Sequence, residues 1–186
     1  MKKNSNVPDE HKRSAPEKIN LALIIVSTTR FHEKKSGDRS TDKTIPRVNR
    51  LLKQNKSISL TFTDIIPDSE EYINNILIKL MKDQTIDTII FSGGTGLSKK
   101  DITYETVESR LEKKIEGFGE LFRSLSYNEI GTSAILSRAT AGILRSKKKN
   151  KAVFLLPGSP NAVRLALKNI IIPEIGHILY IINKEE

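Results

Sequence analysis

Three glycines fall within four residues of one stretch of the chain, Ser-Gly-Gly-Thr-Gly at positions 92–96. The stretch follows the apolar run 86–91, so we expect a loop at the end of a strand. Glycine lets the backbone take positive φ angles, approach a ligand closely and turn successive N–H groups toward an anion. The motif is neither a Walker loop nor GxGxxG. Its spacing alone supports a tight turn and a phosphate-binding loop equally.

Two aspartates lie in loops that are expected to connect a strand to the next helix. Asp101 comes five residues after the last glycine, where it would either cap the next helix or place a carboxylate beside a bound phosphate. Because a carboxylate and a phosphate repel each other, the second interpretation implies a bridging Mg²⁺. Asp68 follows another apolar stretch, and its spacing to Glu71 also matches a helix capping box. Helix capping and metal-assisted phosphate chemistry both stay open for these residues.

A third loop, Leu-Pro-Gly-Ser-Pro-Asn at 156–161, has the composition of a helix start. Ser159 suits the N-cap and Pro160 the first helical turn. The free N–H groups of such a turn would also suit an anion. The sequence contains no histidine spacing typical of a metal site.

The elements that must position these loops alternate along the chain. A continuous apolar run predicts a buried parallel strand at 19–26, and two further strands are expected at 58–66 and 86–91. Apolar residues at helical spacing predict helices at 44–54, 69–82 and 103–113. This alternation predicts a parallel sheet wrapped by helices, with its strand-to-helix loops along one edge. Ligands of such folds usually bind at that edge.

The remaining segments are predicted from the same signals. We expect a polar loop at 31–42 and a broken helix at 117–138. Strands are expected at 140–145 and 152–156, and helices at 161–171 and 174–182 with an interruption at Pro173. Residues 1–18 are polar and are predicted to be a disordered tail, which leaves 19–186 as a single domain.

Composition narrows the classes of function. The chain has 186 residues, 37% hydrophobic and 28% charged, with no cysteine. No apolar run approaches the roughly 18 residues of a membrane span and no signal peptide is evident, so we expect a cytoplasmic protein. The net charge of +9 fits an anionic ligand, nucleic acid or a lysine-rich proteome. The basic cluster 145–151 contains no aromatic residues, so we do not expect nucleic-acid binding.

Three stretches together resemble the MoaB/MogA family of molybdenum-cofactor biosynthesis proteins. They are FSGGTGLSKKDITYETVE at 91–108, EGFGELFRSLSYNEIGTSAILSRATAGI at 116–143 and LLPGSPNAVRLALK at 155–168. The resemblance extends over residues 19–180, and Glu-Ile-Gly-Thr-Ser at 129–133 is more similar to the MoaB branch. It implies an α/β three-layer sandwich with a central, mostly parallel sheet. It also implies an adenylyltransferase that uses MgATP and molybdopterin as substrates.

The resemblance also implies roles for particular residues. Asp101 and Asp68 match the family's functional aspartates, with Asp101 at Mg²⁺ and the triphosphate and Asp68 orienting the metal shell or the nucleophile. The other implied substrate-binding residues lie in the loops described above and in two helical stretches. They are Ser27, Gly93, Gly94, Thr95, Gly96, Glu120, Ser133, Ser137, Arg138, Pro157, Gly158 and Ser159. Judged from the residues alone, Ser133 and Ser137 are equally small helix residues, and Arg138 is equally a surface charge.

Two positions depart from the family pattern. Thr28 replaces an acidic residue that relatives usually have, and Glu116 replaces a proline. Because Thr28 removes a carboxylate that would orient a ligand, a non-catalytic molybdopterin-binding or carrier protein stays an alternative to the enzyme. The family forms trimers, and its MoaB branch often forms hexamers, so the resemblance implies a homo-oligomer. We expect no nucleic-acid or membrane partner. Whether molybdenum or tungsten is the final metal is left open.

Overall fold

The structure of the protein is a computed structural model that describes residues 16–184. Most of the predicted disordered tail lies outside these residues. A six-stranded sheet forms the centre, in the order β2 (Ile58–Ile66), β1 (Ile19–Val26), β3 (Thr88–Ser92), β6 (Lys151–Leu156), β5 (Thr140–Leu144) and β4 (Lys113–Lys114). The first four strands are parallel, whereas β5 and β4 pair in antiparallel fashion. The sheet is therefore mostly parallel, as predicted.

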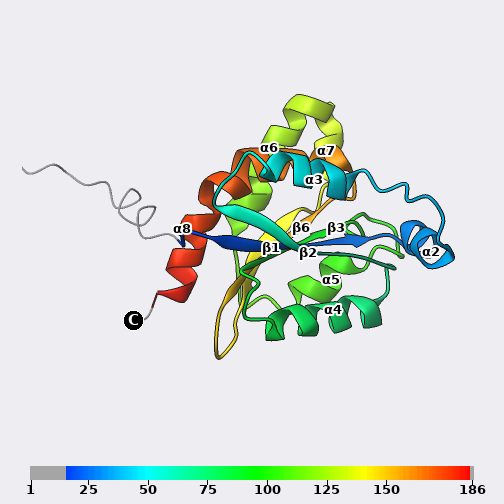
Figure 1. Cartoon of the computed structure of the whole chain (residues 1–186). Coiled ribbons are helices and arrows are strands. Elements are labelled where there is room, and N and C mark those ends of the chain that lie inside the picture. Colours follow the sequence, from blue (N-terminus) through cyan, green and yellow to red (C-terminus); the bar gives the residue numbers. More distant parts are fainter. Residues whose placement is uncertain (1–15, 185–186) are drawn as a thin grey trace, which may run out of the picture.

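Helices cover both faces of the sheet, and Figure 1 shows them above and below the strands. One layer contains α3 (Thr44–Leu52), α6 (Glu116–Ile130), α7 (Pro160–Ala166) and α8 (Ile172–Asn183). The other contains α4 (Glu70–Lys82) and α5 (Thr103–Glu108). Successive strand residues face opposite sides, so Leu23 joins the first core and Ile24 the second. The predicted three-layer α/β sandwich is confirmed.

The burial of the strands explains their sequences. Seven of the eight residues of β1 are buried, as are all residues of β3 and β6. Strands covered on both faces are apolar along their whole length rather than alternating. The edge strand β2 instead alternates between exposed and partly buried residues over much of its length. The continuous apolar runs therefore mark the strands that lie inside the sheet.

The predicted polar loop at 31–42 is wrong in its first half, because Thr28–Ser36 forms helix α2. None of its residues is buried, so the helix carries no apolar face for the sequence pattern to reveal. Its ends are held locally instead. The Ser27 hydroxyl accepts a hydrogen bond from the Arg30 N–H at 3.4 Å, and Gly37 ends the helix in a left-handed conformation with φ 73°.

Two helix boundaries also differ from the predictions. The helix expected at 103–113 ends at Glu108 and is followed by the short strand β4. The expected interruption at Pro173 is absent, since α7, the π-helical segment η2 (Leu167–Ile171) and α8 run on without a gap. Proline clashes with the carbonyl of the preceding turn in a regular α-helix. The π-helical segment immediately before Pro173 changes the hydrogen-bond register of that turn and accommodates the ring.

Within the described residues, Pro160–Asn183 is one helix long and apolar enough to cross a membrane by length and composition alone. Part of its apolar surface faces the sheet, where Val163, Leu167, Ile171 and Leu179 are buried in the core. Core helices pass the same criterion, so this helix is weak evidence for a membrane segment. The break expected within 117–138 is present, because α6 ends at Ile130 and a 3₁₀ segment, η1 (Gly131–Leu136), follows.

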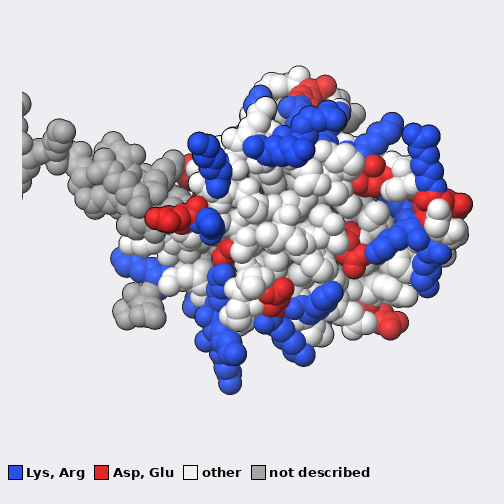
Figure 2. All heavy atoms as spheres, in the orientation of Figure 1, with Lys and Arg blue, Asp and Glu red and all other residues white. Residues whose placement is uncertain are grey.

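Charged side chains surround the face seen in Figure 2. Lysine and arginine lie around its margins with aspartate and glutamate between them, and the middle of this face is largely uncharged. On this face the positive charge is therefore spread out rather than gathered into one basic patch.

Candidate functional site

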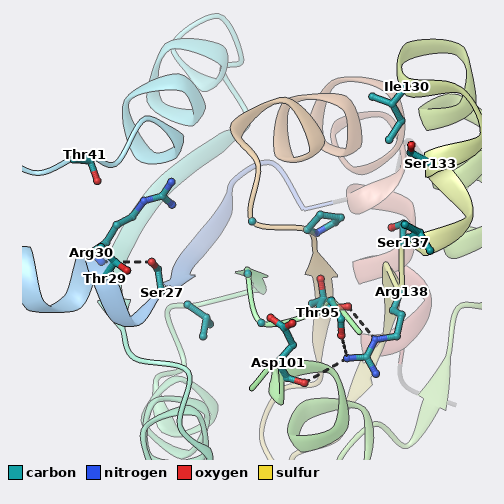
Figure 3. Close-up of a pocket in the computed structure, with 17 residues that line it drawn as sticks. Ser27, Thr29, Arg30, Thr41, Thr95, Asp101, Ile130, Ser133, Ser137 and Arg138 are labelled. Carbon is teal, nitrogen blue, oxygen red and sulfur yellow. Dashed lines mark hydrogen bonds between the residues drawn. The ribbon is translucent and has the colours of Figure 1, made fainter. Parts of the chain in front are cut away.

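A cavity of about 670 Å³ opens at the carboxyl edge of the parallel strands. Its walls come from the β1–α2 turn, the β3–α5 loop, the β6–α7 loop and the end of α6 with η1. Figure 3 shows Ser27 and Arg30 on one side of this cavity and Ser133, Ser137 and Arg138 on the other. Loops far apart in the sequence therefore meet at the edge where the strand pattern predicted a site.

The glycine-rich loop passes very close to β1. Gly93 has φ 111°, and its N–H donates to the carbonyl of Leu156 at 3.0 Å. A Cβ at this position would lie 2.2 Å from the backbone oxygen of Val26, so a side chain is excluded by both conformation and space. A Cβ on Gly158 would lie only 3.3 Å from the Cα of Gly93. Glycine is thus needed here for close packing of three backbone segments.

Asp68 lies behind the glycine-rich loop. Its N–H donates to the Thr28 hydroxyl at 3.3 Å, and its Oδ1 accepts from the Ile102 N–H at 3.4 Å. A Cβ on Gly94 would come within 2.8 Å of both oxygens of the Asp68 carboxylate, so the missing side chain makes room for the carboxylate. Asp68 does not line the cavity itself. Its carboxylate lies beside Gly94 of the glycine-rich loop but not in the cavity lining.

Burial raises the pKa of the Asp68 carboxyl above its ordinary value. The hydrogen bond from Ile102 opposes this shift, while the negative charges of Asp101 and Glu105 add to it. Two further carboxylates therefore lie close enough to act on Asp68. This is an arrangement that a bound cation would relieve.

Asp101 lines the cavity directly. Its Oδ2 accepts from the Ser98 N–H at 3.2 Å, and the same oxygen would lie 2.8 Å from a Cβ on Gly96. This hydrogen bond stays within the loop, so Asp101 does not act as the N-cap of α5, whose N-cap residue is Ile102. The carboxylate is held beside the glycines and is open to the cavity.

Arg138 braces the glycine-rich loop. Its Nε donates to the carbonyl of Thr95 at 2.9 Å, and its Nη2 donates to the carbonyl of Gly96 (Figure 3). The guanidinium also forms an ion pair with Glu105 and lies 4.8 Å from the centre of the Tyr104 ring. Arg138 is therefore not a free surface charge. Its predicted contact with a pterin stays a prediction.

Most of the other predicted residues meet at the same cavity. The predicted residues that line it are Ser27, Gly93, Gly94, Thr95, Gly96, Asp101, Ser133, Ser137, Arg138, Pro157 and Gly158. Ser159 caps α7 by accepting from the Ala162 N–H at 3.1 Å and lines a neighbouring cavity. Glu120 is exposed on α6 and lines neither of these two cavities. The prediction for Glu120 thus gains no geometric support.

Several lining residues were absent from the prediction, among them Thr29, Arg30 and Thr41. Arg30 is the most consequential because it brings a positive charge to the cavity. It pairs with Asp42 at 3.6 Å, and its side chain is 22% exposed. Its position four residues after the end of the interior strand β1 was a usable signal, since the segment that follows such a strand lies at the ligand edge of a parallel sheet.

A second cavity of about 450 Å³ adjoins the first and shares Ile130, Ser137 and Pro157 with it. Phe122 and Leu165 supply apolar walls, while Lys43 and Arg47 contribute positive charge. The two cavities form one extended cleft with a glycine-rich half and a more apolar half. Such a cleft has room for a ligand that combines phosphate groups with a planar ring.

The acidic residues of the site could hold a divalent cation only if water and the phosphates of a bound ligand completed its coordination shell. No cluster of three or more His, Cys, Asp or Glu side chains suited to a metal is found among residues 16–184. Mg²⁺ commonly binds one or two carboxylates and completes its shell with water and substrate phosphates. Asp101 and Asp68, whose charges act on each other, fit that kind of site.

The site is that of an α/β protein suited to an anionic ligand at the carboxyl edge of its strands. The family described as "Probable molybdopterin binding domain" matches residues 22–177, and the chain belongs to this family. The resemblance to the MoaB/MogA family is thereby confirmed.

Individual relatives agree with this assignment. The chain is 39% identical over 177 residues to "Molybdenum cofactor biosynthesis protein B" of Bacillus cereus, covering 95% of this chain and 98% of the relative. It is 41% identical over 169 residues to "Probable molybdopterin adenylyltransferase" of Methanocaldococcus jannaschii, covering 91% and 96%. The crystal structure of the tungsten cofactor synthesizing protein MoaB from Pyrococcus furiosus superimposes with a TM-score of 0.78 at 35% identity, covering 91% of this chain and 100% of that one.

Proposed function

We propose that this protein is a molybdopterin adenylyltransferase of molybdenum or tungsten cofactor biosynthesis. It transfers AMP from MgATP to the phosphate of molybdopterin. One relative carries the name of this enzyme, and others are named for molybdenum cofactor biosynthesis. The observation that carries the proposal is that the glycine-rich loop and Asp101 line one cleft, with the Asp68 carboxylate directly behind Gly94 of that loop.

In the proposed reaction, an oxygen of the molybdopterin phosphate attacks the α-phosphorus of ATP. A new P–O bond joins the two phosphates, and the bond from the α-phosphorus to the oxygen bridging to the β-phosphate breaks. Pyrophosphate leaves with that electron pair. A phosphate monoester is largely ionised at neutral pH, so the nucleophile needs no general base. The protein has to position two anions and offset their repulsion.

The residues of the cleft suit these tasks. Loop 93–96 lines the cavity and is the proposed binding site for the nucleotide phosphates, and Arg138 holds the loop in shape. Arg30 adds positive charge from the opposite wall. Asp101 and Asp68 are the residues that would hold Mg²⁺, which when bound offsets the negative charge of the triphosphate.

Direct assay tests the proposal. Purified protein is incubated with molybdopterin and MgATP, and adenylylated molybdopterin and pyrophosphate are measured. We expect both products in equal amounts. Binding of molybdopterin and ATP without either product would reject catalysis and would favour the carrier.

A non-catalytic molybdopterin-binding protein is the second candidate, and Thr28 is the observation that favours it. The Thr28 hydroxyl accepts a hydrogen bond from the N–H of Asp68, so a neutral side chain occupies the position where the family resemblance implies an acid. Thr28→Asp restores the acid. If the enzyme is active, Thr28→Asp changes its rate while turnover is detectable in both forms. If only Thr28→Asp turns over substrate, the natural chain is the carrier.

A homo-oligomer and a cytoplasmic location stay predictions. Large apolar side chains are exposed on α6 and η1, including Tyr127, Ile130, Ile135 and Leu136. Contact with a second copy of the chain would cover such residues. Light scattering after size exclusion is expected to give the mass of a trimer or hexamer, and a monomer would contradict this.

A further inference from the structure

Thr103 carries a buried hydroxyl group with no hydrogen-bond partner. It is the first residue of α5, and its side chain is completely buried. Among the described residues, only its Oγ1 and that of Thr44 are buried side-chain polar atoms without a partner. Buried hydroxyls normally find a partner, because leaving one unpaired destabilises the folded state. The presence of an unpaired buried hydroxyl at Thr103, next to the cleft, therefore needs a physical reason.

The hydroxyl faces the same small space as the Asp68 carboxylate. A Cβ placed on Gly94 would lie 2.2 Å from Thr103 Oγ1, 2.6 Å from Asp68 Oδ2 and 2.8 Å from Asp68 Oδ1. All three oxygens thus surround the point that glycine leaves empty. The backbone holds them there, since the Thr103 N–H donates to the Gly94 carbonyl at 2.9 Å and Ile102 donates to Asp68.

We propose that Thr103 is a positioning residue for Asp68 and acts through it on the ligand bound in the cleft. When the ligand is bound, the Thr103 hydroxyl donates to the Asp68 carboxylate, directly or through one water molecule. A half-buried carboxylate near the negative charges of Asp101 and Glu105 has few donors, and Ile102 supplies one at 3.4 Å. The Thr103 hydroxyl supplies a second one and fixes the rotamer of the carboxylate.

This inference rests on the proposed function for its kinetic test. Thr103→Val removes the hydroxyl with little change in volume, and Thr103→Ser keeps it. We expect Thr103→Val to lower kcat by about tenfold to a hundredfold, with the KM for ATP nearly unchanged, and Thr103→Ser to recover most of the rate. The thermal midpoint of Thr103→Val should stay equal or rise, because an unpaired buried hydroxyl is removed. An unchanged kcat in Thr103→Val would overturn the proposal.

A matched control and a double variant separate this role from a structural one. Thr44→Val makes the same chemical change at the other unpaired hydroxyl, at the start of α3, and should leave kcat as it is. In an Asp68→Ala background, Thr103→Val should have little further effect, since either change removes the same interaction. Independent, multiplicative losses would show that Thr103 does not act through Asp68.

The geometry has a test that does not depend on turnover. A crystal structure with magnesium and ATP should place Thr103 Oγ1 within hydrogen-bonding distance of an Asp68 oxygen, or of a water bound to it. A hydroxyl turned elsewhere would overturn the proposal even in an active enzyme. If this contact is present but no adenylylated product forms, the adenylyltransferase function fails while the positioning role is supported.

Discussion

Arg138 Nε donates to the backbone carbonyl of Thr95 at 2.9 Å, and this bond ties η1 and its following turn to the glycine-rich loop. The same guanidinium reaches the carbonyl of Gly96 and the carboxylate of Glu105. Two walls of the cleft are thus held together by one side chain. The shape of the loop depends on a planar group that has several donors in fixed directions.

Arg138→Lys should disturb this loop although the charge is kept. A lysine ammonium cannot replace the forked donors of the guanidinium or its stacking on Tyr104. We expect kcat/KM for adenylyl transfer to fall by about tenfold to a hundredfold. Amide hydrogen exchange at 93–101 should become faster. Arg145→Lys is the control, because Arg145 forms an exposed pair with Glu112 and lines neither cavity. Equal exchange rates in both variants would contradict the bracing role.

Asp101→Asn should separate binding from turnover. The amide keeps the size of the side chain but removes the charge proposed to hold Mg²⁺. We expect kcat to fall by about a hundredfold or more, while calorimetry still detects molybdopterin. Asp64→Asn, in an exposed pair with Lys34, should leave both quantities unchanged. Full turnover in Asp101→Asn would exclude the proposed role.

Asp68→Asn should make the protein more stable at neutral pH. Since the folded protein raises the pKa of this carboxyl above 3.8, ionisation is less favourable in the folded state than in the unfolded state. The contribution of Asp68 to stability is therefore fully present below about pH 3.8 and is lost as the pH rises through the folded pKa. Urea unfolding at a series of pH values should show the advantage of Asp68→Asn appearing above that range.

Asp83→Asn should change the stability of the protein in the opposite direction to Asp68→Asn. Hydrogen bonds from the Thr85 hydroxyl and N–H lower the pKa of Asp83 in the folded protein. Its stabilising contribution is present above the unfolded pKa and is lost as the pH falls through the folded one. Asp83→Asn should therefore destabilise the protein at pH 7. The same sign for both variants would contradict the assignment of these shifts.

Gly93→Ala should destabilise the fold by about 2 to 4 kcal/mol. The new Cβ would meet the Val26 carbonyl at 2.2 Å, and φ 111° disfavours any side chain. Gly117→Ala is the matched control, since Gly117 lies in α6 with nothing within 4 Å of the added Cβ. That variant should gain about 0.5 to 1 kcal/mol from helix propensity. Denaturant unfolding of both variants measures the contrast.

The sequence by itself predicted five of the six strands and the mostly parallel character of the sheet. The apolar run at 19–26 predicted β1 at its observed bounds, and the mixed polar and apolar stretch 58–66 predicted the edge strand β2 at its bounds. The signal for β1 is local, because a strand buried on both faces must be apolar along its length. The loop at glycines 93–96 and the helix N-cap at Ser159 could also be predicted, since glycine and serine each favour particular local backbone conformations.

Only the tertiary structure decided which side chains act together. Thr103 and Asp68 are far apart in the chain, and their shared space exists because Gly94 lacks a side chain between them. From the sequence alone, Arg138 could equally have been a surface charge. The packing of η1 places it against the glycine-rich loop. Helix α2 was missed because capping at Ser27 and Gly37, rather than burial, holds it. Contacts between distant segments follow from how whole elements pack, and that information is spread over the entire core instead of residing in any one stretch of sequence.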